Sequence, residues 1–175
     1  MSLRPLLALA VTCCLAAGTP ATSRSATVAL TPGGWGAARI GMSVREAERS
    51  LHVKLDLDRE ASGSDECVYG LWPRTREPPV AFMFISGRLA RVDARSSGVK
   101  TDRGVGIGDP EARVRSVYGL QLKSERHAYE DPPSKYLTWW EPGSRRGVRF
   151  EIGSDRKVEA VYAGGKAIEY IEGCL

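Results

Sequence analysis

The chain has 175 residues, of which 42% are hydrophobic, and its formal net charge is only +4. The charges of both signs are interspersed rather than gathered into runs, which is typical of a solvated surface, and we therefore expect no nucleic-acid partner.

The N-terminus has the pattern of a bacterial secretory signal. Met1–Arg4 carries one positive charge, and residues 5–17 are predominantly apolar. This run is shorter than the roughly 20 residues that a membrane-spanning helix needs. We therefore expect no membrane span but a signal peptide over residues 1–26, cleaved between residues 18 and 26, and a periplasmic or secreted protein. The alternative, a lipid anchor on Cys13 or Cys14, fits less well because the preceding residues match the lipoprotein pattern poorly.

The remainder of the chain suits one domain of ordinary size. Residues 22–36 consist largely of Ser, Thr, Ala, Gly and Pro, and we expect residues 27–36 to form a flexible N-terminus. A single domain is then expected over residues 37–175.

Two cysteines, Cys67 and Cys174, lie beyond the signal. In an oxidising compartment we expect them to pair, and the alternative is two separate free thiols. A disulfide that closes a loop of about 100 residues stabilises a domain by about 4 kcal/mol in the chain-entropy model.

A short amphipathic helix is predicted to start after Ser43. Ser43 and Glu46 have the spacing of a capping box, in which each side chain binds the backbone N–H of the other residue. Val44, Ala47 and Leu51 follow at helical spacing and form one apolar stripe.

A second helix of the same kind is predicted further along the chain. Asp109 is expected to be its N-cap, Pro110 its first residue and Gly119 the residue that ends it. When Gly41 is aligned with Gly108 without a gap, the positions expected to be buried coincide: Ala47 aligns with Val114, and Leu51 with Tyr118.

Three strand-like segments follow each helix. They span residues 67–72, 80–85 and 89–94 after the first helix, and residues 136–140, 148–152 and 158–163 after the second. We therefore predict an α+β fold of two tandem α-β-β-β units, repeat 1 over about residues 37–98 and repeat 2 over about residues 99–175. The six strands are expected to form one antiparallel sheet with both helices packed on one face.

The stretch Gly41-Met42-Ser43-x-x-Glu46-Ala47 resembles the helix start of the SmpA/OmlA (BamE-like) envelope proteins. The tandem arrangement resembles the β-lactamase inhibitory protein-like superfamily, which repeats that module. The resemblance implies that the open face of the sheet and its loops bind other proteins, without catalysis. It assigns no functional residue to this chain.

Catalytic signatures are missing from the sequence. His52 and His127 stand alone, no serine lies in a Gly-x-Ser-x-Gly elbow, and the glycines of residues 104–108 lack the spacing of a dinucleotide-binding loop. We expect no catalytic residue, no metal site and no cofactor.

An aromatic cluster is the best candidate for a binding surface. On a strand, Tyr136 and Trp140 share one face and Trp139 takes the other, and Arg145 and Arg146 follow closely. We predict an interaction surface on the helix-free face of the sheet, centred on the tryptophan that points outward and made of Trp72, Tyr136, Trp139, Trp140 and Arg149.

The function expected from the sequence is non-enzymatic binding of another protein, as an inhibitor, an immunity factor or an envelope assembly partner. Two alternatives stay open: a cell-wall glycan-binding module and an unrecognised periplasmic hydrolase.

Overall fold

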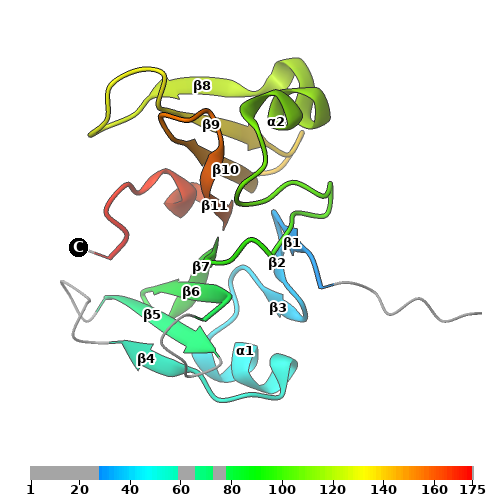
Figure 1. Cartoon of the computed structure of the whole chain (residues 1–175). Helices are drawn as coiled ribbons and strands as arrows, with labels where there is room; N and C mark the ends of the chain where they lie inside the picture. The colour runs from blue at the N-terminus through cyan, green and yellow to red at the C-terminus, as the bar shows by residue number, and fades with distance from the viewer. Residues whose placement is uncertain (1–27, 59–65, 73–77, 175) are drawn as a thin grey trace, which may run out of the picture.

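A computed structural model describes residues 28–58, 66–72 and 78–174. The predicted signal peptide, with Cys13 and Cys14, lies outside these residues. The described part is an α+β fold with an eight-stranded antiparallel sheet, a small three-stranded sheet and two α-helices (Figure 1). Neither described helix is long and apolar enough to cross a membrane.

The large sheet has the strand order β4-β5-β6-β7-β11-β10-β9-β8. Its strands are β4 (Asp56–Asp58), β5 (Cys67–Trp72), β6 (Val80–Ile85), β7 (Arg88–Ala94), β8 (Lys123–Arg126), β9 (Lys135–Trp140), β10 (Gly147–Ile152) and β11 (Val158–Gly164). The six predicted strands are confirmed to within one residue at each end. The short edge strands β4 and β8 were not predicted.

The two halves of the large sheet meet where β7 pairs with β11. This ladder runs from Ala94 opposite Val161 to Arg91 opposite Gly164. Strands β4 to β7 therefore lie on one side of the ladder and strands β8 to β11 on the other.

Helix α1 (Val44–Leu51) begins at the predicted capping box. The Ser43 hydroxyl accepts a hydrogen bond from the Glu46 N–H at 3.3 Å, and the Glu46 carboxylate accepts one from the Ser43 N–H at 2.7 Å. Both bonds satisfy backbone donors that have no partner inside the helix, so this prediction is confirmed.

Helix α2 (Glu111–Tyr118) ends at Gly119 as predicted, but the prediction that Asp109 is its N-cap is wrong. Pro110 is the N-cap and makes no side-chain capping bond. The Asp109 carboxylate instead accepts hydrogen bonds from the Gly106 N–H at 2.8 Å and from the Lys100 ammonium at 3.1 Å. It closes the preceding turn because a backbone donor and an opposite charge are both available there.

One hydrophobic core lies between the large sheet and both helices. Ala47 of α1 and Val114 of α2 belong to the same buried cluster as every second residue of the central strands. The strand residues of this cluster include Val80, Phe82, Phe84, Val92, Leu137, Trp139, Val148, Phe150, Val161 and Ala163. Both helices therefore cover the same face of the sheet, and alternate strand residues point to the other, helix-free face.

Residues 28–36, the described part of the segment that was expected to be a flexible N-terminus, contain two short strands. Strands β1 (Leu30–Thr31), β2 (Gly34–Trp35) and β3 (Ala38–Arg39) form the small sheet. Leu30 is completely buried, and its N–H donates to the Lys100 carbonyl at 2.9 Å. The ring of Trp35 packs against the ring of Phe82, with 6.1 Å between the ring centroids. The buried Leu30 and the partly buried Trp35 thus hold a segment whose composition is typical of a loop.

Candidate functional site

The predicted disulfide between Cys67 and Cys174 is present. It holds the C-terminal segment, residues 165–174, against the helix-free face of the sheet. Within that segment η2 (Lys166–Glu169) is a short 3₁₀-helix, and Ala167 and Cys174 pack with Met83 in a second, smaller apolar cluster. Figure 1 shows this segment, in red, on the side of the sheet away from α2. The face that was expected to be open is therefore partly covered.

Arg91 of β7 binds the C-terminal segment through hydrogen bonds to its backbone carbonyls. Its side chain, 2% exposed, donates to the carbonyls of Ala167 at 3.0 Å and Tyr170 at 2.8 Å. The same guanidinium binds the Asp93 carboxylate at 2.7 Å and the Tyr69 hydroxyl at 2.5 Å. Burial raises the pKa of Asp93, and it raises the pKa of Tyr69 to about 12. This group of side chains joins β5, β7 and the C-terminal segment.

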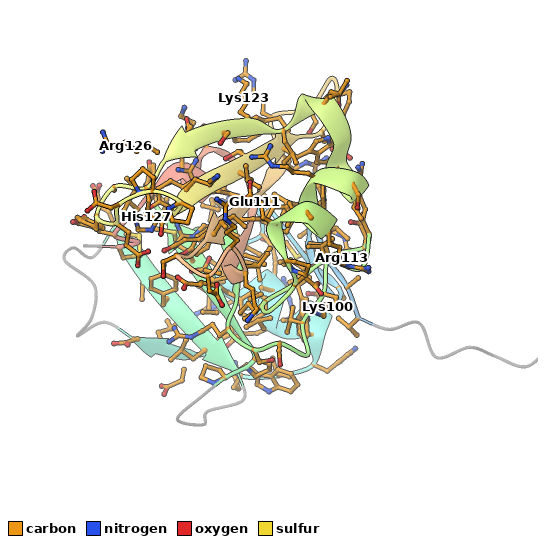
Figure 2. The ribbon with its side chains drawn as sticks, turned by 45° about the horizontal axis from the view of Figure 1, so that its top comes forward. Lys100, Glu111, Arg113, Lys123, Arg126 and His127 are labelled. Atoms are coloured by element: carbon orange, nitrogen blue, oxygen red, sulfur yellow. A yellow bond between two sulfur atoms is a disulfide. The ribbon has the colours of Figure 1, made fainter. Side chains whose placement is uncertain are left out.

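His127 organises the opposite part of the helix-free face. It directly follows β8 (Figure 2) and its ring stacks on Tyr136 with 4.8 Å between centroids. Its Nδ1 lies 3.2 Å from the Tyr129 N–H and 3.0 Å from the Glu130 N–H and accepts from both. The proton must then be on Nε2, which donates to the Glu151 carboxylate at 3.0 Å. Both ring nitrogens are occupied, so His127 has no free nitrogen to act as a base.

Arg149 completes a continuous polar network across this face. Its guanidinium lies 4.1 Å from the Tyr136 ring centroid and donates to Glu125 at 2.6 Å and to Thr138 at 3.0 Å. Tyr162 links this part to Arg91, because its hydroxyl donates to Glu151 at 2.9 Å while the Arg91 guanidinium lies 4.6 Å from its ring centroid. Arg91 thus pairs with Asp93 and Arg149 with Glu125, whereas Glu151 accepts hydrogen bonds from His127 and Tyr162.

Three of the five residues of the predicted interaction surface are buried. Tyr136 and Arg149, 3% and 4% exposed, lie on the expected face but inside the polar network. They are covered because Glu125 pairs with Arg149 and the ring of His127 stacks on Tyr136. These side chains do not reach the surface on which they were predicted to act.

The three tryptophans of the predicted surface lie in different surroundings. Trp139, 6% exposed, belongs to the core on the helix side and packs against Tyr118, with 5.6 Å between the ring centroids. Trp72 is half-buried beside Trp35, and their ring centroids are 6.4 Å apart. Trp140 is half-buried too, but it lines a groove. Trp140 is therefore the outward tryptophan of the adjacent pair.

The groove at Trp140 has a volume of about 660 Å³ and lies at the ends of β9 and β11. Its lining consists of Ile40, Trp140, Ser144, Arg145, Arg146, Gly165 and Lys166. Gly147 pairs with Trp140 on one side and with Gly164 on the other. A Cβ atom on Gly147 would lie 3.0 Å from the indole of Trp140. A residue with a side chain at this position would therefore crowd the ring.

The groove is basic. Arg145 and Arg146 are exposed and, among the residues that the structure describes, neither guanidinium makes an ion pair or a hydrogen bond. Lys166, the third cation, binds the Glu169 carboxylate at 2.5 Å. The sequence pointed to these two arginines because they closely follow the tryptophan pair. Ile40, Gly165 and Lys166 were missed because only the fold brings these distant segments together.

The described ranges contain no group of three or more His, Cys, Asp or Glu residues that could hold a metal ion. His52, the second histidine, lines an open hollow of about 790 Å³ along α1, together with Arg45 and Arg49. Comparison of the chain with protein-family models, curated proteins and solved structures finds no match. The site therefore has to be interpreted from its own geometry.

Proposed function

We propose that this chain is an exported, non-enzymatic domain that binds another protein, as an inhibitor, an immunity factor or an envelope assembly partner. The groove at Trp140 is the observation that carries this proposal. A half-buried indole beside two guanidinium groups without ion pairs in the described structure has the composition of an interface anchor. An apolar ring that remains partly in water gains free energy when a partner covers it.

The disulfide supports a periplasmic or extracellular location. Bridges of this kind form and persist in oxidising compartments, and Cys67 and Cys174 are joined here. The apolar N-terminal stretch of the sequence agrees with export.

The polar network supports a binding role rather than a catalytic one. A general base needs a nitrogen or oxygen that can reach the substrate proton. His127, the best candidate in the network, uses both ring nitrogens within the protein. Arg91 and Arg149 likewise bind carboxylates and carbonyls of the chain itself.

The proposal extends to the architecture. We infer two tandem α-β-β-β units, related to the SmpA/OmlA (BamE-like) and β-lactamase inhibitory protein-like superfamily by the motif at Gly41. The succession α1-β5-β6-β7 and α2-β9-β10-β11, with β7 beside β11, supports this division. Proteins of that superfamily bind partners through the sheet and its loops, which agrees with a groove at the strand ends.

The test has two stages, beginning with capture of the partner from an envelope extract on the immobilised, oxidised domain. The affinity of the purified partner is then measured for the wild type and for Trp140→Ala. We expect this variant to lose about 2 kcal/mol of binding free energy, a factor of about 30 in Kd, at an unchanged Tm. Leu120→Ala, which removes an apolar side chain that is fully exposed away from the groove, serves as control and should bind as the wild type does.

Equal affinity of Trp140→Ala and the wild type would contradict binding through the groove. A fall in Tm that accounts for the whole loss of binding would place Trp140 in the core instead.

A further inference from the structure

We infer that the groove at Trp140 takes a short acidic segment of the partner protein, in which an apolar side chain lies next to carboxylates. The apolar side chain packs against Trp140 and Ile40, and the carboxylates pair with Arg145 and Arg146. This inference rests on the proposed function, because it names the chemistry of the partner at the same groove.

The charges at the groove point to an acidic partner. Some exposed cations of the described chain pair with carboxylates: Arg115 lies 2.7 Å from Glu111, and Lys157 lies 3.1 Å from Asp155. Others, such as Arg45 and Arg49 on α1, make no ion pair with a described residue. Arg145 and Arg146 are also without a carboxylate partner in the described chain, and they line the same groove as the indole of Trp140. Guanidinium groups bind carboxylates through two parallel hydrogen bonds, so two adjacent arginines offer a matched site for acidic side chains.

The apolar part of the groove lining is expected to bind the apolar side chain of the segment. Trp140 and Ile40 are half-buried and come from segments that are 100 residues apart in the chain. A groove of about 660 Å³ is in the range of sites that enclose small ligands, so it accepts a few side chains rather than a broad surface. A nucleic acid would meet only two cations free of ion pairs here, too few for the row of phosphate contacts on which its affinity depends.

The walls of the groove are held in place by hydrogen bonds from backbone N–H groups. In the β9–β10 turn the Glu141 N–H donates to the Arg146 carbonyl at 2.9 Å, and the Arg146 N–H donates to the Ser144 hydroxyl at 3.2 Å. On the opposite wall the Gly165 N–H donates to the Ala90 carbonyl at 3.0 Å. A backbone that is already ordered loses little further conformational entropy when a short segment binds.

The experiment is a selection of displayed random peptides on the exported, oxidised protein. Parallel selections use Arg145→Glu/Arg146→Glu and, as control with the same change of charge, Arg45→Glu/Arg49→Glu on α1. We expect the wild type and the control to enrich peptides that carry carboxylates beside an apolar residue. The strongest of these peptides should bind Arg145→Glu/Arg146→Glu at least about tenfold more weakly, because charge-assisted hydrogen bonds are replaced by repulsion. Its affinity for the wild type should fall as salt is added.

Several outcomes would overturn the inference. They are enrichment of neutral or basic peptides, enrichment of no peptide, and equal binding of acidic peptides to the wild type and Arg145→Glu/Arg146→Glu. If the captured protein partner depends on Trp140 but not on the two arginines, the proposed function stands and the acidic segment is wrong. Arg145→Ala/Arg146→Ala replaces the charge reversal if that variant does not fold.

Discussion

Glu111 shows how one side chain joins two elements. It is the first residue of α2, is 8% exposed, and its carboxylate lies 2.7 Å from Arg115 and 3.4 Å from Lys135 of β9. Burial acts to raise the pKa of Glu111, but the two cations outweigh it and hold the pKa below its ordinary value. The helix N-terminus favours the same charged form.

Glu111→Gln should therefore destabilise the fold in a pH-dependent way. Because the pKa of Glu111 is lowered in the folded state, its stabilisation is present above the ordinary glutamate pKa of about 4.3 and is lost as the pH falls through the folded value. We expect the variant to be less stable than the wild type by about 1 kcal/mol at neutral pH and by a smaller amount at about pH 3. Urea unfolding at both pH values measures this, and a difference that does not change with pH would refute it.

The candidate site was predicted from the sequence only in part. Alternation along β9 placed Trp139 and Trp140 on opposite faces, but which of them faces the helices depends on how the strand pairs with β10. Arg149 was expected to be part of the interaction surface on the helix-free face. Its burial comes from Glu125, a contact across 24 positions that no local pattern reveals.

The element scale is best tested at the start of α1, where Ser43 and Glu46 form the capping box. Ser43→Ala removes the hydroxyl that accepts from the Glu46 N–H and should lower the free energy of unfolding by about 1 kcal/mol. Ser154→Ala, at an exposed hairpin position, should leave it unchanged. Thermal unfolding of both variants compares them, and equal Tm values would show that the capping box contributes nothing.

The long strands were predictable because each of them combines β-forming residues with turn residues at its ends. At the turn between β6 and β7, for example, Ser86 and Gly87 have positive φ values of 48° and 71°, the conformation that a two-residue hairpin requires. The edge strands β4 and β8 were not predictable, since they are short, and Lys123–Arg126 is wholly polar and exposed. Asp109 was assigned to the wrong role because a cap and a turn use the same residue type.

At the scale of the whole molecule, the disulfide ties the first half of the sheet to the C-terminal segment across 107 positions. The double variant Cys67→Ser/Cys174→Ser should lose about 4 kcal/mol of stability, because the unfolded chain regains the entropy that the closed loop removes. Guanidinium unfolding measures the loss. The wild type in reductant is the matched control, and its unfolding midpoint should equal that of the double variant. Identical midpoints for the variant and the oxidised wild type would contradict this prediction.

The β7–β11 ladder has a consequence for how two copies of the chain can meet. Residues 91–94 and 161–164 are neighbours in the middle of the sheet, yet they belong to different halves of the chain. The second half of one molecule can therefore complete the first half of another with the same hydrogen bonds, which is the geometry of a domain-swapped dimer. In such a dimer Cys67 of one chain would face Cys174 of the other. Oxidation would then lock the exchange covalently, and a non-reducing gel would show which molecules had exchanged before their thiols closed.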